Sequence, residues 1–166
     1  MPADPSEIHR QLRQRGLTVA VAESLTGGLL SAALTTSPGS SGSFRGGLVV
    51  YATELKAMLA GVPQPLLDAQ GAVSAAVAVA LARGVRENLG ADLGVGITGV
   101  AGPESVGEHR AGTVFLAVAG ADFHEVSRAD LAGSRAEIRA RSVDAALDLL
   151  LGVLLAAHEL GMPEAP

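Results

Sequence analysis

Three short apolar runs, separated by helix-like segments, constrain the fold of this chain more than any other feature. They are Leu17 to Ala22, Leu48 to Tyr51 and Leu93 to Ile97, and valine is frequent in them. Apolar runs of this length are typical of strands buried on both faces of a sheet. Because helical segments lie between them, the three strands are predicted to be parallel and joined by helical crossovers.

Capping signals place the helices of the first half of the chain. Asp4 followed by Pro5 predicts a helix start, and Gly16 predicts its end. Gly27 and Gly28 predict a turn into a short helix. Further helices are expected at about Leu29 to Thr35, Glu54 to Leu59 with Thr53 as a possible cap, and Ala75 to Leu89 capped by Ser74, whereas Ser37 to Gly47 is expected to be a loop.

The second half predicts a hairpin and a long final helix. Strands expected at Thr113 to Ala119 and Phe123 to Ala129 are joined by only three residues, which implies antiparallel pairing. Ser134 and Glu137 form a capping box for a helix that becomes almost wholly apolar at Leu149 to Leu155. That end should pack against the sheet or another subunit. The predicted fold is a three-layer α/β/α domain over residues 1–166 with a mixed sheet.

Composition limits the class of protein. The chain has 166 residues, 48% of them hydrophobic and only 2% aromatic, so one core of small aliphatic side chains is expected. The absence of cysteine excludes disulfides and thiolate metal sites. A net charge of -5 without a basic cluster argues against nucleic acid as a partner. With no secretory signal or membrane span recognised, a cytoplasmic protein with a small-molecule substrate is expected.

Ser24 occupies a position that suits a nucleophile. It follows the first predicted strand and precedes Gly27-Gly28, where ligands collect in α/β sheets. The glycines would let backbone N–H groups approach a ligand, and the following helix N-terminus would favour an anion or an oxyanion. The alternative is that Ser24 and Thr26 merely cap the helix that begins near Leu29.

Lys56 is the only lysine among twelve basic residues. This is either chance in an arginine-biased composition or a requirement for a neutral amine, which arginine cannot provide. Ser24, Tyr51, Lys56 and the segment Thr98 to Gly102 are predicted to meet at one sheet edge. The histidines His9, His109, His124 and His158 are scattered, so a lysine whose pKa is lowered by about 2 to 3 units is the candidate base for the serine.

Other familiar motifs lack their required context. Gly94 to Gly99 fits G-x-G-x-x-G, but it lies within a predicted strand and leads to Pro103 rather than to a helix. Neither a phosphate-binding loop with lysine nor an H-E-x-x-H pair is present in the sequence. No metal and no cofactor are therefore expected.

Four ordered blocks carry a family resemblance over nearly the whole chain: AESLTGGLL, GSSGSFRGGLVVYATELKAMLAGV, GITGVAGP and GSRAEIRARSV. Together they resemble the C-terminal domain of the competence/damage-inducible protein CinA, which also occurs alone as nicotinamide-nucleotide amidase. The resemblance implies a serine/lysine amidohydrolase that converts nicotinamide mononucleotide to nicotinate mononucleotide and ammonia. It also implies that any pyrophosphatase activity of the larger N-terminal domain of two-domain relatives is absent.

The resemblance assigns roles to residues. Ser24 is implied as the nucleophile, Lys56 as the base and Tyr51 as an assisting hydroxyl. Arg135 and Arg139, one helical turn apart, either meet the substrate phosphate or form a solvated helix turn. The substrate-binding residues that we expect are Thr26, Gly27, Gly28, Ser40, Ser41, Phe44, Thr98, Gly99, Ala101, Gly102, Arg135 and Arg139.

Some positions depart from the family pattern. Leu25 stands where the family usually has cysteine, Thr53 where it has asparagine, and Ser105-Val106 where it has two glycines. Residues 109–112 are His-Arg-Ala-Gly where the family usually has Lys-Pro-Val-Gly. An inactive pyridine-nucleotide-binding module and a structural subunit are therefore the alternatives to an enzyme. A homo-oligomer, specifically a dimer, is expected, without nucleic-acid or membrane partners.

Overall fold

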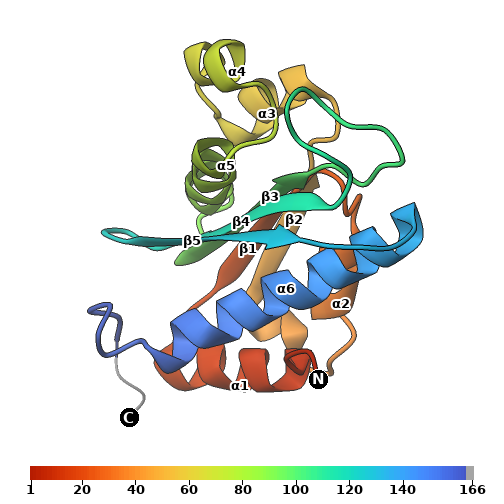
Figure 1. Ribbon diagram of the computed structural model, residues 1–166. Helices are drawn as coiled ribbons and strands as arrows, with labels where there is room; N and C mark the ends of the chain where they lie inside the picture. Colours follow the sequence, from red (N-terminus) through yellow and green to blue (C-terminus); the bar gives the residue numbers. More distant parts are fainter. Residues whose placement is uncertain (164–166) are drawn as a thin grey trace.

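The computed structural model describes residues 1–163, which form three layers with a sheet between two groups of helices (Figure 1). The last three residues of the expected 1–166 domain lie outside the described part. The elements are α1 Pro5–Arg15, β1 Val19–Glu23, α2 Leu29–Leu34, the 3-10 turn η1 Ser40–Gly42, β2 Phe44–Val49, α3 Thr53–Ala60, α4 Gln64–Gln70, α5 Ala75–Asn88, β3 Leu93–Gly99, β4 Thr113–Ala119, β5 His124–Asp130 and α6 Arg135–Leu155.

The sheet has the strand order β2-β1-β3-β4-β5. Strand β1 pairs in parallel with both β2 and β3, whereas β4 is antiparallel to β3 and to β5. The carboxyl ends of β1, β2 and β3 therefore meet at one edge. The predicted mixed sheet with parallel crossovers and one antiparallel hairpin is confirmed.

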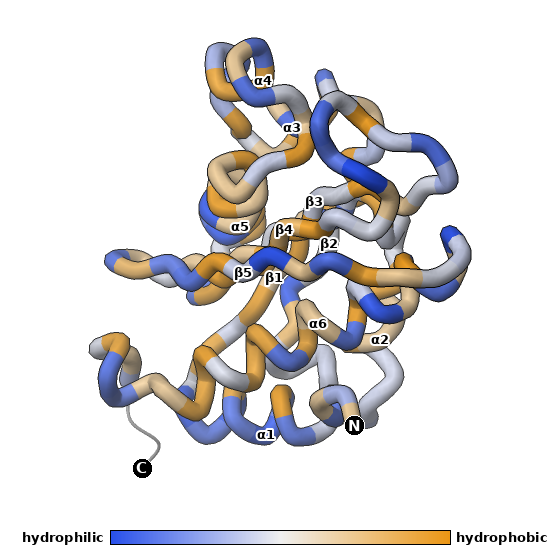
Figure 2. Tube along the Cα trace, in the orientation of Figure 1, coloured by the Kyte–Doolittle hydropathy of each residue, from blue (hydrophilic) through white to orange (hydrophobic). Residues whose placement is uncertain are grey.

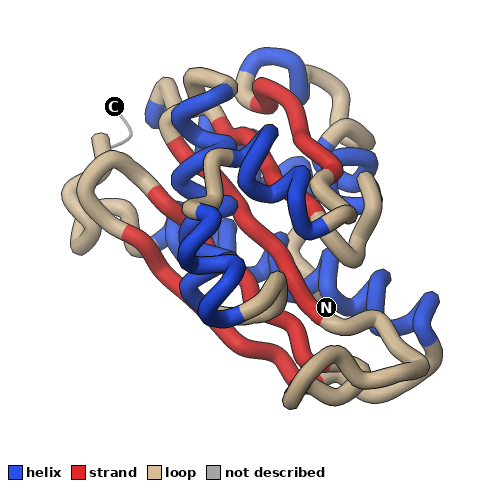
Figure 3. Tube along the Cα trace, turned by 90° about the horizontal axis from the view of Figure 1, so that it is seen from above, coloured by secondary structure: helices blue, strands red, loops and turns tan. Residues whose placement is uncertain are grey.

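Alternation along β1 separates two cores. Val19 and Val21 pack with α1, α2 and α6, whereas Ala20 and Ala22 pack with α3, α4 and α5. Apolar residues accordingly lie between the layers (Figure 2). Seen from above, the strands run side by side beneath helices (Figure 3).

Glycines in β3 explain the motif that resembled a dinucleotide fingerprint. A Cβ atom added at Gly94 would collide with the carbonyl of Ala82, and one at Gly96 would collide with the carbonyl of Ala78. Both carbonyls belong to α5. The glycines thus allow α5 to pack unusually close to the central strand, which is a structural role rather than a nucleotide-binding one.

The capping predictions are confirmed at three helices. The side chains of Asp4 and Ser74 accept backbone N–H groups of α1 and α5, and Ser134 with Glu137 forms the predicted capping box of α6. The apolar end of α6 packs mainly within the chain, although Leu155 is 63% exposed. No helix within residues 1–163 combines the length and apolar character needed to span a membrane.

Three local predictions were wrong. Strand β2 begins at Phe44, inside the expected loop, and ends at Val49, so Tyr51 follows the strand instead of closing it. Gly46 and Gly47 have low strand propensity and interrupt the apolar pattern by which the start of this strand could have been predicted. Helix α4 was not predicted, because it has only seven residues and no side chain caps its start. Thr53 is the first residue of α3 rather than its cap, which is Ala52.

Candidate active site

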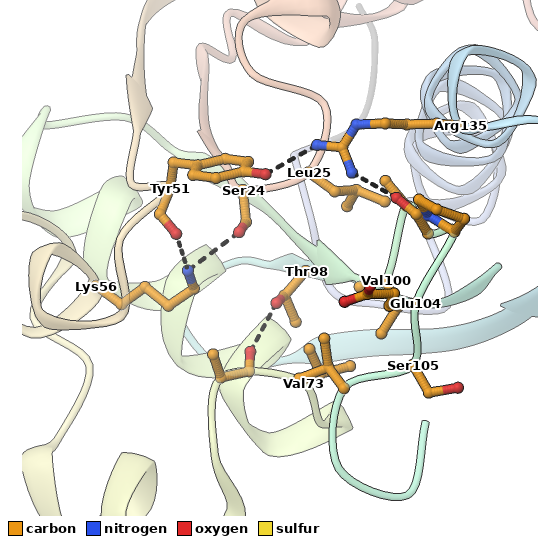
Figure 4. A pocket seen from close by; sticks show the side chains of 16 residues that line it. Ser24, Leu25, Tyr51, Lys56, Val73, Thr98, Val100, Glu104, Ser105 and Arg135 are labelled. Carbon is orange, nitrogen blue, oxygen red and sulfur yellow. Dashed lines mark hydrogen bonds between the residues drawn. The ribbon is translucent and has the colours of Figure 1, made fainter. Parts of the chain in front are cut away.

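A cavity of about 390 Å³ opens at the edge where β1, β2 and β3 end (Figure 4). It has polar side chains at its inner end and a loop between β3 and β4 along one wall. Its lining consists of Ser24, Leu25, Tyr51, Lys56, Ala72, Val73, Thr98, Gly99, Val100, Ala101, Gly102, Pro103, Glu104, Ser105, Val106 and Arg135.

Ser24 lies directly after β1 and is only 7% exposed. Its backbone N–H donates to the carbonyl of Ile97 in β3, and its carbonyl accepts the N–H of Gly27. Gly27 and Gly28 both have positive φ, 57° and 101°, a backbone conformation that glycine adopts most readily. The sheet and the glycine turn together fix where the hydroxyl points.

Glu23 is a site residue that sequence reasoning missed. Its side chain is fully buried, and its carboxylate accepts the backbone N–H groups of Gly28, Leu30 and Ser31 and the hydroxyl of Ser31. With these four donors, the buried carboxylate provides acceptors for the free N–H groups at the start of α2. It thereby holds the turn that carries Ser24 in place. An acidic residue at the end of an apolar run was the signal available in the sequence.

This contact corrects two expectations about the start of α2. The helix N-terminus is not open to a substrate anion, because the Glu23 carboxylate already accepts three of its N–H groups. Ser24 and Thr26 do not cap the helix either. The cap position is Gly28, which makes no side-chain hydrogen bond.

Lys56 reaches the serine from α3. Its Nζ lies 3.0 Å from Ser24 Oγ, 2.8 Å from the carbonyl oxygen of Val50 and 3.3 Å from that of Tyr51. The residue is 1% exposed. Burial lowers the pKa of the amine to about 8, and the charge of Glu54 offsets part of this effect.

The geometry around Lys56 suits a neutral amine. Two of its N–H groups can donate to the Val50 and Tyr51 carbonyls, which leaves the nitrogen lone pair for the Ser24 hydroxyl proton. Val50 in turn donates its N–H to the carbonyl of Glu23. The turns that hold the serine and the lysine are therefore directly connected.

Tyr51 and Arg135 meet at the outer end of the cavity. The Arg135 guanidinium donates to the Tyr51 hydroxyl at 2.9 Å and to the carbonyl of Gly102 at 2.7 Å. Tyr51 is 59% exposed. Its hydroxyl is thus turned toward the arginine, while its backbone carbonyl faces Lys56 (Figure 4).

The end of β3 and the segment that follows it form the wall that the sequence predicted. Thr98, Gly99, Ala101 and Gly102 all line the cavity. The Thr98 hydroxyl donates to the carbonyl of Ala72 at 2.6 Å, which ties the wall to the segment before α5. By holding Ala72 against the end of β3, Thr98 helps to fix the shape of the cavity that both residues line.

Several expected site residues do not line the cavity. Arg139 donates to the carbonyls of Leu25 and Thr26, so it braces the serine turn. Thr26, Gly27 and Gly28 form that turn behind the cavity surface. Ser40, Ser41 and Phe44 lie at the amino-terminal end of the parallel strands, whereas the cavity lies at their carboxyl-terminal end. Phe44 begins β2 and pairs with Val19 at the start of β1.

The loop that departs from the family pattern contributes directly to the cavity. Glu104, Ser105 and Val106 are part of the lining. Val106 and His109 exchange two backbone hydrogen bonds of 2.9 and 3.0 Å, which close a small turn at the tip of the loop. The departures from the family pattern at Ser105 and Val106 therefore lie on the cavity surface itself.

No histidine takes part in the cavity lining. His9 is fully buried, with Nδ1 2.8 Å from Ser43 Oγ and Nε2 2.6 Å from the Leu34 carbonyl oxygen. His109 packs edge-on against Phe115, and His124 contacts Arg83. Within residues 1–163, no cluster of three or more histidine or acidic side chains is arranged to hold a metal ion.

Comparisons with known proteins agree with this architecture. The sequence profile described as the CinA C-terminal domain matches residues 4–154. A CinA-like protein of Frankia casuarinae is 50% identical over 143 residues, which cover 86% of this chain and 33% of that protein. A putative competence-damage inducible protein of Moorella thermoacetica is 48% identical over 152 residues, 89% of this chain and 36% of that protein. The chain thus spans about a third of the length of these curated relatives.

Solved structures extend the comparison. A competence-damaged protein (CinA) superfamily protein from Klebsiella pneumoniae has a TM-score of 0.87 at 32% identity, covering 91% of this chain and 95% of that one. The competence/damage inducible protein CihA from Agrobacterium tumefaciens has a TM-score of 0.83 at 34% identity, covering 92% and 97%.

Proposed function

This chain belongs to the CinA C-terminal domain family, and we propose that it hydrolyses the carboxamide of nicotinamide mononucleotide to nicotinate mononucleotide and ammonia. One observation supports the proposal above all: a buried lysine whose lowered pKa is about 8 lies 3.0 Å from the hydroxyl of a serine at a strand end. Such a pair is the serine/lysine form of an activated nucleophile.

The first half of the reaction forms an acyl-enzyme. Neutral Lys56 takes the proton of the Ser24 hydroxyl as the oxygen attacks the carboxamide carbon. The resulting ammonium then gives that proton to the departing nitrogen. The C–N bond breaks, ammonia leaves, and the acyl group remains on Ser24 as an ester.

The second half returns the enzyme to its starting state. Lys56 takes a proton from water, the hydroxide attacks the ester carbon, and the serine oxygen leaves with the proton from Lys56. The backbone N–H of Leu25, directly after the nucleophile, donates to no other group within residues 1–163 and is a candidate donor to the oxyanion. Arg135, at the mouth, is the candidate partner for the phosphate.

The test is stoichiometric product formation by the whole chain. With nicotinamide mononucleotide as substrate, ammonia and nicotinate mononucleotide should appear in equal amounts. Nicotinamide without the ribose phosphate serves as the control and should react far more slowly. Thermal stabilisation by the nucleotide with no ammonia released would refute the proposal and favour an inactive pyridine-nucleotide-binding module.

A further inference from the structure

The cavity carries two opposite charges that are not paired with each other. Among the described residues that line it, Glu104 is the only acidic one and Arg135 the only arginine. Within residues 1–163, neither side chain takes part in an ion pair. A carboxylate and a guanidinium that share a cavity without compensating each other are both available to a ligand.

The positive charge at the mouth is held in place by neutral groups. The Arg135 guanidinium donates to the Tyr51 hydroxyl at 2.9 Å and to the Gly102 carbonyl at 2.7 Å. These acceptors fix the position of the guanidinium but do not cancel its charge. An anionic group of a ligand would therefore meet a positioned cation there.

The negative charge is carried by a loop with a fixed base and tip. The Gly112 N–H donates to the Val100 carbonyl at 2.7 Å, which closes the base of the loop. Toward the tip, His109 packs edge-on against Phe115. Figure 4 shows the Glu104 side chain directed into the cavity from this loop. The carboxylate is thus presented to the cavity by a supported segment.

A ligand that matches both charges carries a cation and an anion at different places. Nicotinamide mononucleotide has this pattern, because its ring is a positively charged pyridinium and its phosphate is negative. With the carboxamide at Ser24 and the phosphate at Arg135, the ring would lie between them, beside the wall that includes Glu104. The carboxylate would attract the pyridinium, whereas it would repel a phosphate ester that lacks a cation.

We propose that Glu104 is a specificity-determining residue that selects the oxidised, cationic pyridinium form of the nucleotide over its reduced form, whose dihydropyridine ring is neutral. This inference rests on the proposed function, because it takes the carboxamide to bind at Ser24. Glu104 makes and breaks no bond in the reaction. Its effect therefore falls on the dissociation constant of the nucleotide and on KM.

The test measures binding without turnover. In the Ser24→Ala chain, calorimetry gives the dissociation constants of nicotinamide mononucleotide and of its reduced form, which share the phosphate, ribose and carboxamide and differ in ring charge. The oxidised form should bind more tightly. Adding Glu104→Gln should weaken binding of the oxidised form by about fivefold, as expected for an exposed ion pair, and should leave that of the reduced form nearly unchanged.

Two further variants control for position and for shape. Glu108→Gln removes the same charge from the same loop, at a residue that is not part of the cavity lining, and should change neither constant. Glu104→Asp keeps the charge and should retain most of the preference for the oxidised form. Added salt should reduce the preference when Glu104 is present and have little effect in the Glu104→Gln chain. Melting temperatures check the fold of each variant.

Equal weakening of both nucleotides by Glu104→Gln, or equal binding of both before that substitution, would overturn the inference. Neither outcome decides the proposed hydrolysis, which ammonia release by the wild-type chain measures. Ammonia release without a preference for the charged ring would overturn only the role of Glu104. A preference that Glu104→Gln abolishes, in a chain that releases no ammonia, would support that role and refute the hydrolysis.

Discussion

The inner and outer ends of the cavity are built in different ways. At the inner end, Ser24 and Lys56 are buried, and each is bonded to backbone groups of the sheet edge or of the turn that follows β2. At the outer end, Tyr51 and Arg135 are exposed and bonded mainly to each other and to Gly102. Buried groups with several partners keep a fixed geometry, whereas exposed pairs contribute little energy and rearrange easily. We therefore expect chemistry at the inner end and substrate recognition at the outer end.

Ser24→Ala should have the largest effect. Removing the nucleophile should lower kcat by roughly 1000-fold or more, while the dissociation constant of nicotinamide mononucleotide should change only a few-fold because the hydroxyl is small. Steady-state kinetics and calorimetric binding measure the two quantities. Comparable turnover by the variant would remove Ser24 from the mechanism.

Glu23→Gln tests whether the inner end depends on its buried support. The amide nitrogen would face backbone N–H donors, so the turn carrying Ser24 should shift, and kcat should fall by about 10- to 100-fold with KM nearly constant. Ser31→Ala is the matched control, because it removes only one donor to the same carboxylate. Equal effects of the two variants would contradict a positioning role for Glu23.

Arg135→Ala should act mainly at the outer end. Losing one charged donor near the mouth should raise KM by about 10-fold, with kcat within a few-fold of wild type. Arg141→Ala, which removes a nearby exposed arginine outside the cavity lining, is the control and should change neither constant. A larger loss in kcat than in KM for Arg135→Ala would mean that the two ends are not separate.

Chelation should have the smallest effect, because the proposed steps need only Ser24, Lys56 and water. Activity should remain within error after exhaustive treatment with a chelator and should not respond to added divalent ions. Loss of activity that a single metal restores would contradict the serine/lysine scheme.

The sequence predicted the inner end better than the outer end, for a physical reason. The ends of parallel strands share one edge, so locating three apolar runs was enough to bring Ser24, Lys56 and the Thr98 segment together. Ser40, Ser41 and Phe44 do not line this cavity, because they precede or begin β2 and so lie at the amino-terminal end of the parallel strands. Side-chain partners across distant segments, such as Arg135 with Tyr51 or Glu23 with the start of α2, leave no periodic pattern in a sequence.

The most direct test of the central claim is the pH dependence of kcat/KM for the wild-type chain beside Lys56→Arg. If neutral Lys56 is the base, the wild-type value should fall tenfold per pH unit below an apparent pKa near 8 and level off above it, because the protonated amine cannot accept the serine proton. Lys56→Arg should lose about 100-fold or more in kcat at every pH, because a guanidinium does not deprotonate. An arginine variant with most of the wild-type rate, or a wild-type profile without a transition near pH 8, would contradict the account.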